Sequence, residues 1–297
     1  MILCFLFAIV AAHGSNEPAP AKLLFRVRRF LSRPLHEKSR SLYSRWRRLF
    51  AHAPFPIWLP FGAWFIGRGD LIGCTLSSDS FESAERAFAQ SFLKPGMTVF
   101  DIGAHQGFHT LLASRCVGSS GRVFSFEPSP RERRALRLNL KINFCDNVAI
   151  QPVALGGEET TADLYVVDEF DTGCNSLRPP NVPESTSTVR VSVRTLDNWV
   201  TEQEIDRVDF IKLDAEGAEL SVLKGASKSL ARMRPVLLVE VAQIRTAAWG
   251  YDAVEIVRFL EEVGYEWFEI LDGGKLAPLT QVDRQDMNLV AVPRRDG

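Results

Sequence analysis

One stretch decides the fold of this 297-residue chain: Val99-Phe100-Asp101-Ile102-Gly103-Ala104-His105-Gln106-Gly107. It begins as an apolar strand, turns at two glycines and continues into a helical pattern that ends near Val117. Glycines at 103 and 107 allow a tight turn and a close approach to a ligand, because no Cβ is in the way. The spacing G-x-x-x-G differs from the G-x-G-x-x-G that places a diphosphate on a helix N-terminus. We therefore predict a strand–loop–helix unit that binds a nucleotide-like ligand without a diphosphate at this loop.

Strands and helices alternate outward from this unit. Apolar runs predict strands at 97–103, 122–127, 148–155, 208–214 and 235–241, and helical patterns cover 107–117, 130–142, 218–231 and 253–263. Segments 162–167 and 188–195 alternate in polarity and fall in an insertion, and 266–271 with 288–292 predict a terminal antiparallel pair. Continuous apolar strands that alternate with helices indicate a Rossmann-like, doubly wound, mostly parallel α/β sheet with helices on both faces.

Two acids mark the expected ligand site of this sheet, where ligands bind beyond the carboxyl ends of the strands. Asp101 immediately precedes the glycine loop, where its charge would repel a diphosphate but suits an amino group. Glu127-Pro128 ends the second strand, where a carboxylate can accept hydrogen bonds from ribose hydroxyls. The pair favours S-adenosylmethionine over NAD as the ligand, and an NAD-dependent dehydrogenase is the weaker alternative.

A second acidic cluster follows the strand at 208–214. Asp214 ends that strand, Glu216 lies in the turn and Glu219 opens a helix. Helix N-terminal chemistry explains Glu219, but an unpaired carboxylate at a buried strand end such as Asp214 is costly. Glu240 ends the next apolar run. We expect these acids to meet at the same edge of the sheet as the first pair.

Residues 70–293 resemble the FkbM family of S-adenosylmethionine-dependent methyltransferases, whose core is a seven-stranded sheet. The D-x-E-G-x-E element at 214–219 is the most specific motif. The resemblance implies transfer of a methyl group to a hydroxyl oxygen of a sugar, polyketide or similar small molecule. His105 stands where the family usually has Asn, and Ala242 lies where a His often follows the acid. The motifs that carry the resemblance are Leu93-Lys94-Pro95-Gly96, Val99–Ala104, Phe126-Glu127-Pro128, Val153-Ala154-Leu155-Gly156, Thr195-Leu196-Asp197, Ile211–Glu219 and Val222–Ala226.

Site roles follow from the motifs and the resemblance. The residues expected to bind the cofactor are Asp101, Gly103, Ala104 and Gly107 for the methionine portion, Glu127 and Pro128 for the ribose, and the Val153–Leu155 backbone around Ala154 for the adenine edge. Asp214, Glu216 and Glu240 are the expected catalytic acids, as proton acceptor or as groups that position the substrate. We expect no metal, and we expect His109 to pack locally. A non-catalytic binding or scaffold protein of the same fold is the alternative.

The net charge of −1 averages two unequal parts. Residues 22–50 hold ten basic residues and one acid, hence +9, whereas residues 51–297 hold 25 basic and 34 acidic residues, hence −9; Glu17 supplies the remaining charge. We expect three parts: an apolar run and linker at 1–21, a basic amphipathic extension and aromatic strap at 22–69, and the FkbM-like domain at 70–297. The composition is ordinary for a globular protein and excludes collagen-like, mucin-like and mostly disordered chains.

The N-terminal segments are expected to set location. Residues 1–12 are apolar but shorter than the roughly 20 residues of a spanning helix, so a signal, an anchor and a disordered tail stay open. The basic segment can form amphipathic helices that lie on an anionic membrane or on nucleic acid, or that pack on the acidic body. Three prolines in 54–66 forbid a continuous helix and predict a strap on the main domain or a pocket wall. Five scattered cysteines argue against a disulfide scaffold. We expect a cytoplasmic protein with no nucleic-acid partner and peripheral membrane contact through residues 1–50.

Overall fold

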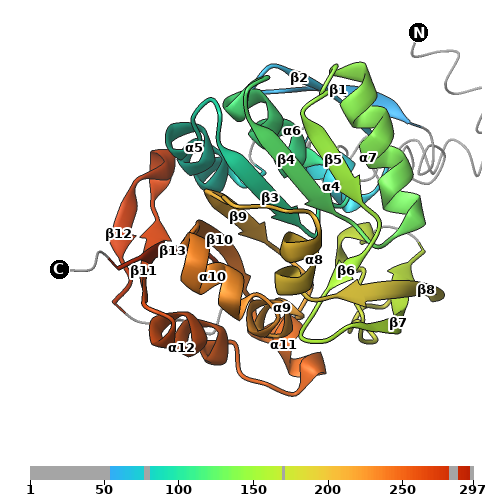
Figure 1. Cartoon of the computed structure of the whole chain (residues 1–297). Coiled ribbons are helices and arrows are strands. Elements are labelled where there is room, and N and C mark those ends of the chain that lie inside the picture. Colours follow the sequence, from blue (N-terminus) through green and yellow to red (C-terminus); the bar gives the residue numbers. More distant parts are fainter. Residues whose placement is uncertain (1–53, 77–80, 169–170, 281–286, 295–297) are drawn as a thin grey trace, which may run out of the picture. The chain divides into compact units, whose positions relative to one another are not determined.

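A computed structural model describes residues 54–76, 81–168, 171–280 and 287–294. All of them lie in one compact unit, His52–Gly297 (Figure 1). The predicted apolar run and basic amphipathic helices at 1–50 lie outside the described residues. Within the described residues, no helix combines the length and apolar character needed to cross a bilayer.

The central sheet has eight strands in the order β12-β11-β13-β10-β9-β3-β4-β5. The five strands from β10 to β5 are parallel, and β13, β11 and β12 run antiparallel to their neighbours. The doubly wound, mostly parallel sheet and its terminal antiparallel pair are thus confirmed, with the short β12 added to the seven expected strands. The bounds are β3 Thr98–Ile102, β4 Arg122–Phe126, β5 Val148–Gln151, β9 Phe210–Leu213, β10 Val236–Val241, β11 Tyr265–Ile270, β12 Leu276–Pro278 and β13 Met287–Pro293.

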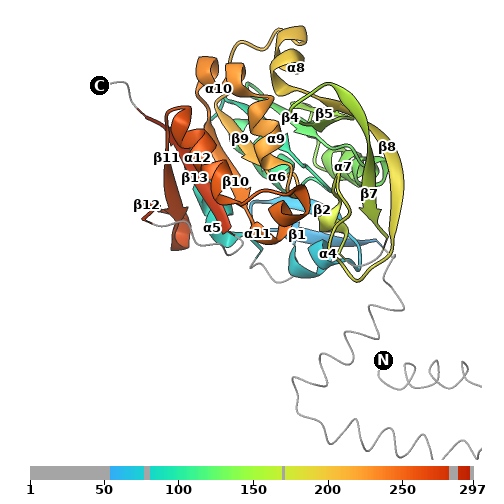
Figure 2. The same cartoon turned by 90° about the horizontal axis from the view of Figure 1, so that it is seen from below.

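Helices cover both faces of the sheet, because neighbouring strand residues point to opposite sides. Phe210 packs with the side chains of α5 and α6, whereas Ile211 packs with those of α8, α9, α10 and α12. Figure 2 shows α8, α9 and α10 on one side of the sheet, and α4 and α5 on the other. The helices are α4 Leu71–Leu76, α5 Ser83–Phe92, α6 Phe108–Val117, α7 Pro130–Ile142, α8 Leu196–Glu202, α9 Glu219–Lys224, α10 Ser227–Met233, α11 Gln243–Thr246 and α12 Val254–Glu262.

Two expected elements are each split in the structure. The predicted strand at 148–155 ends as β5 at Gln151, because Pro152 has no N–H to continue the ladder. The chain then forms β6 (Ala154–Leu155), which joins β7 (Thr160–Val167) and β8 (Thr186–Arg194) in a separate three-stranded sheet. This sheet contains the predicted insertion.

The predicted helix at 218–231 is interrupted at Gly225, between α9 and α10. A Cβ on Gly225 would lie 2.1 Å from the carbonyl oxygen of Gly156, so the end of β6 occupies that space. Asp197 caps the second helix, since its carboxylate accepts hydrogen bonds from the backbone N–H of Lys228 (3.0 Å) and Ser229 (2.7 Å). The break is therefore a consequence of tertiary packing.

The proline-rich strap forms a hairpin of β1 (Phe55–Leu59) and β2 (Ala63–Gly67). Its inner face, with Leu59 and Phe65, is buried against α6 and α7. Phe65 also lines the cavity described below. The strap therefore packs on the main domain and forms part of a pocket wall.

Candidate functional site

A cavity opens at the carboxyl ends of β3, β4, β9 and β10. The structure brings all ten sequence-predicted site residues to its wall: Asp101, Gly103, Ala104, Gly107, Glu127, Pro128, Ala154, Asp214, Glu216 and Glu240. They come from four strands and one insertion, and they meet because parallel strands deliver their carboxyl ends to one edge of the sheet.

The glycines of the loop are required by their neighbours. Gly103 has φ +85°, and a Cβ there would lie 1.7 Å from the carbonyl oxygen of Asp214. Gly107 has φ +97°, and a Cβ there would lie 2.4 Å from Cδ1 of Leu136 on α7. The loop is thus pressed between the turn after β9 and α7, so its glycines serve packing as well as close approach to a ligand.

Asp101 lies at the base of the loop with only 2% of its surface exposed. Its Oδ2 accepts a hydrogen bond from the Thr110 hydroxyl at 2.5 Å, and that hydroxyl also contacts the Ser125 hydroxyl at 3.0 Å. Burial raises the pKa of Asp101. A cationic amino group placed beside it would stabilise the ionised carboxylate, which burial deprives of hydration.

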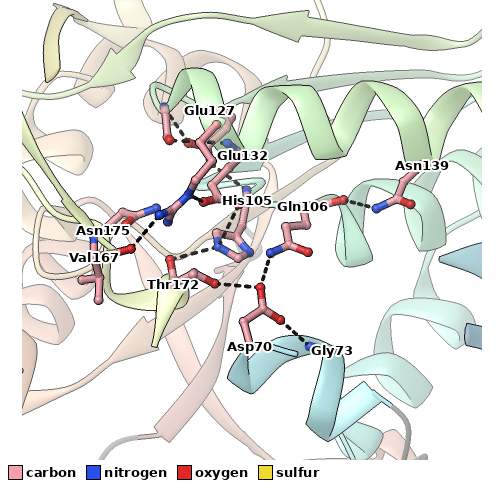
Figure 3. A network of polar contacts seen from close by, with 12 residues as sticks. Asp70, Gly73, His105, Gln106, Glu127, Glu132, Asn139, Val167, Thr172 and Asn175 are labelled. Carbon is pink, nitrogen blue, oxygen red and sulfur yellow. Dashed lines mark hydrogen bonds and ion pairs between the residues drawn. The ribbon is translucent and has the colours of Figure 1, made fainter. Parts of the chain in front are cut away.

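Glu127 is held from both sides by backbone N–H groups. Its Oε2 accepts from the His105 N–H and its Oε1 from the Ser129 N–H, each at 2.7 Å (Figure 3). Burial raises its pKa to about 7, against the lowering effects of His105 and the Ser129 N–H. Each oxygen keeps a further lone pair, so the carboxylate fits two ribose hydroxyl donors.

His105, which departs from the expected Asn, ties the loop to the insertion. Its Nε2 lies 3.0 Å from the carbonyl oxygen of Thr172 and 3.6 Å from Oε2 of the buried Glu132. The neighbouring Gln106 donates from Nε2 to Asp70 at 2.7 Å, and the Thr172 hydroxyl donates to the same carboxylate oxygen at 3.1 Å (Figure 3). The imidazole thus has local structural partners in the wall of the cavity.

Asp214, Glu216 and Glu240, here called the three-carboxylate cluster, bring one oxygen each within 4.8 Å of one another. Asp214 Oδ2 pairs with Lys212 Nζ at 3.1 Å, and Glu216 Oε2 pairs with Arg245 Nε at 3.0 Å. Oε2 of Glu240 is buried and has no hydrogen-bond partner among the described residues. Glu240 thus brings to the cluster a buried carboxylate oxygen that is free to accept a hydrogen bond.

Burial and mutual repulsion act on the titration of this cluster. Burial, followed by the negative charge of Asp214, raises the pKa of both Glu216 and Glu240 well above the ordinary value. Oxygen ligands of this kind suit Mg²⁺, but two of the three acids already have a cationic partner. The absence of a metal stays a prediction.

Glu219 has the local role expected of it. Its Oε1 accepts from the N–H groups of Ala215 (2.8 Å) and Gly217 (3.2 Å), so it closes the turn between β9 and α9. Burial raises its pKa to about 7. Its carboxylate is directed at the backbone of the turn.

Several charged residues that line the cavity were not predicted from the sequence as site residues, among them Arg245, Lys212, His109 and Glu82. Lys212 lies on β9 in the middle of the sheet and is 2% exposed. A lysine within an otherwise apolar strand was the sequence feature that could have indicated a buried charge at the site. His109, expected to pack locally, lines the cavity and contacts Oε2 of Glu82 at 2.5 Å through Nε2. Burial would lower the pKa of His109, but the Glu82 carboxylate outweighs it and raises the pKa. Glu82 stands 27 residues earlier, so no local pattern predicts this pair.

Comparisons with known proteins identify the family. A family model described as "Methyltransferase FkbM domain" matches residues 101–267. The chain is 26% identical to "2-O-methyltransferase NoeI" of Sinorhizobium fredii, with 48% of this chain and 62% of that protein covered. It is 24% identical to "Hexuronic acid methyltransferase AglP" of Haloferax volcanii, with 55% and 61% covered. The chain thus spans about three-fifths of the length of these two relatives.

A solved structure, the FkbM methyltransferase of Methylobacillus flagellatus, aligns with 66% of this chain and 43% of its own, at 20% identity and a TM-score of 0.43. The family model covers more than half of the 297 residues, from the acid that precedes the glycine loop to the strand β11. On this match the protein belongs to the FkbM family of methyltransferases.

Proposed function

We propose that this methyltransferase moves the methyl group of S-adenosylmethionine to a hydroxyl oxygen of a small molecule or glycan. Membership of the FkbM family implies methyl transfer with S-adenosylmethionine as the cofactor. It therefore argues against the alternative of an NAD-dependent dehydrogenase. The hydroxyl acceptor and the role of each residue are our proposal. The observation that carries it is the unpartnered Oε2 of Glu240 beside the ion-paired Asp214 and Glu216.

The cavity fits the cofactor in chemical type. Asp101 offers a buried carboxylate to the cationic amino group, beside a loop whose glycines leave the backbone bare. Glu127, fixed by two N–H groups, offers its remaining lone pairs to the ribose hydroxyls. The backbone around Ala154 and the ring of Pro128 line the same wall and suit the adenine. When bound, the cofactor supplies an electrophilic methyl group on a sulfonium.

The proposed step is an in-line displacement. The acceptor oxygen forms a bond to the methyl carbon while the carbon–sulfur bond breaks and its electron pair stays on sulfur. The acceptor's proton passes to Oε2 of Glu240, which is unpartnered and whose pKa burial raises, so that its ionised form is a stronger base than an exposed carboxylate. Holding oxygen, carbon and sulfur in line can supply roughly 7–11 kcal/mol of the rate enhancement.

The other two acids of the cluster serve to orient the acceptor. Lys212 fixes Asp214, and Arg245 fixes Glu216, which also has a left-handed backbone with φ +52°. A polyhydroxyl ligand such as a sugar can donate to both fixed carboxylates while a third hydroxyl faces Glu240. Two relatives are named as a 2-O-methyltransferase and a hexuronic acid methyltransferase, which supports a sugar hydroxyl as the acceptor.

The test separates cofactor binding from methyl transfer. The purified chain is incubated with methyl-labelled S-adenosylmethionine and a panel of sugars and glycans, and the labelled product is identified. Glu240→Gln keeps the size of the side chain but removes the proton acceptor, so we expect an unchanged cofactor Kd and a transfer rate lower by about 10²–10⁴-fold. Asp163→Asn, at an exposed position on β7, is the matched control and should leave both unchanged.

Two outcomes would count against the proposal. Cofactor binding with no labelled product from any hydroxyl compound would favour the non-catalytic scaffold protein. Full transfer activity in Glu240→Gln would remove Glu240 from the role of proton acceptor and leave Asp214 or Glu216 as the remaining acids of the cluster.

A further inference from the structure

The outer face of the β1–β2 hairpin is apolar and open to solvent. Trp58 and Trp64 are register partners, and their rings meet edge to face with centroids 4.9 Å apart. They are 58% and 47% exposed, although the opposite face of the same strands is buried. An antiparallel sheet with one face on the core usually carries polar side chains on the other. A pair of exposed tryptophans there indicates a contact surface.

Helix α7 lies along one edge of β2, because its side chains bind backbone groups of Trp64 and Ile66. The Asn143 side chain accepts from the N–H of Trp64 at 2.9 Å and donates to its carbonyl oxygen at 2.6 Å. Asn139 accepts from the N–H of Ile66 at 2.7 Å, so two side-chain amides fix the hairpin to the helix. The next residue after Asn143, Phe144, is 86% exposed. A third exposed aromatic residue therefore follows directly on the residue that binds the Trp64 backbone.

The exposed stripe of α7 is cationic. Arg134, Arg137 and Lys141 are exposed at helical spacing, and Leu138 between them is 45% exposed. The helix contains five basic residues and one acid, Glu132, which is buried. Asp146 is an exposed acid just beyond the end of the helix. Aromatic side chains next to several basic ones are typical of protein surfaces that lie on anionic lipid.

We propose that the outer face of the β1–β2 hairpin and the exposed stripe of α7, together called the membrane face, bind the surface of an anionic bilayer. The aromatic rings would enter at the level of the headgroups, and the basic side chains would contact lipid phosphates. The chain that precedes this face adds to the charge complementarity. Residues 22–50 carry +9, and the described residues begin at Pro54, directly before β1. A lipid surface accounts for the rings and the cations together, whereas an apolar protein partner would not require the cations.

The test uses the full chain and vesicles of phosphatidylcholine alone or with 30% phosphatidylglycerol. We expect sedimentation with the anionic vesicles only, with affinity that falls as salt is added. Trp58→Thr combined with Trp64→Thr keeps residues that suit a strand and removes both rings, and should weaken binding about tenfold. Replacing Arg134, Arg137 and Lys141 by Gln should weaken it about fivefold for each charge removed.

The control is Leu271→Ser, which removes an exposed apolar side chain at the far end of the sheet and should leave vesicle binding unchanged. The S-adenosylmethionine affinity and far-ultraviolet circular dichroism of each variant report on its folding. Vesicle-bound tryptophans should be quenched by brominated lipid in the parent chain and less so in the double variant. Binding unaffected by the double Trp variant, or quenching equal in both proteins, would overturn the proposal and leave any membrane contact to residues 1–50. A protein that forms dimers in solution and does not bind vesicles would also overturn the proposal, and would indicate that a second copy of the chain covers this face.

Discussion

The titration of Glu127 makes S-adenosylmethionine affinity depend on pH in a defined direction. The carboxylate is 5% exposed, and burial raises its pKa to about 7. Ribose hydroxyls donate to the charged form, so binding requires deprotonation and affinity rises with pH until the carboxylate is fully ionised. At pH 6, one unit below that pKa, about a tenth of the molecules carry the charge. We expect a Kd about tenfold higher at pH 6 than at pH 8, which corresponds to about 1.4 kcal/mol.

Glu127→Gln tests the origin of this dependence. The amide cannot accept from both the His105 and Ser129 N–H groups, and it removes the charge that strengthens two ribose hydrogen bonds. Loss of about 1.5 kcal/mol from each of the two bonds gives about 3 kcal/mol, or a Kd raised about 150-fold. Isothermal titration calorimetry at pH 6, 7 and 8 measures both quantities. The cofactor's own amino group also titrates, so the readout is the difference between the profiles of the parent and the variant.

Two results would refute this reasoning. The first is a parent Kd that stays constant between pH 6 and pH 8. The second is a Glu127→Gln profile with the same slope as the parent, which would assign the dependence to another group. Asp163→Asn, an exposed carboxylate change on β7, should reproduce the parent profile and serves as the control.

Three further perturbations test the packing and electrostatics of the site. Gly103→Ala places a Cβ against the carbonyl oxygen of Asp214 and should lower the free energy of unfolding, measured in urea, by about 3 kcal/mol or more. Gly250→Ala is the control: Gly250 also has a positive φ, +79°, but no atom lies near the added Cβ, so the free energy of unfolding should fall by about 1 kcal/mol. Equal losses in the two variants would contradict the predicted clash. Burial opposes the charge of Glu82, but His109 lowers the pKa of Glu82 to about 2, and Glu82 in turn raises the pKa of His109. The ion pair therefore stabilises the fold fully between about pH 4.5 and pH 6.5. The contribution of Glu82 is lost as the pH falls toward 2, and that of His109 is lost as the pH rises. Glu82→Gln should therefore lower Tm most in that window, and an equal drop at pH 9 would argue against an ionic pair. Chelator treatment should leave methyl transfer unchanged, because two acids of the three-carboxylate cluster have cationic partners; loss of activity that Mg²⁺ restores would show a metal enzyme.

Local sequence pattern predicted most of the scaffold. The alternation of apolar strands and helices predicted the doubly wound sheet, and the acids at the strand ends predicted the cavity wall, because parallel strands must bring their carboxyl ends to one edge. The contact between Lys212 and Asp214 could also have been predicted, because residues two apart along an extended chain point to the same side. The end of β5 was signalled by Pro152, which cannot continue a ladder.

The sequence by itself therefore determined the order of elements, the family motifs and the edge at which the site forms, since these depend on periodicity and on residues close together in the chain. Only the tertiary structure decided which acid of the cluster is left without a partner. Arg245 reaches Glu216 from α11, and Glu82 reaches His109 from the start of α5. It also decided that α7 packs, through Asn139 and Asn143, against the hairpin that carries Trp58 and Trp64. Such pairings depend on loop paths and side-chain rotamers, which no local pattern encodes.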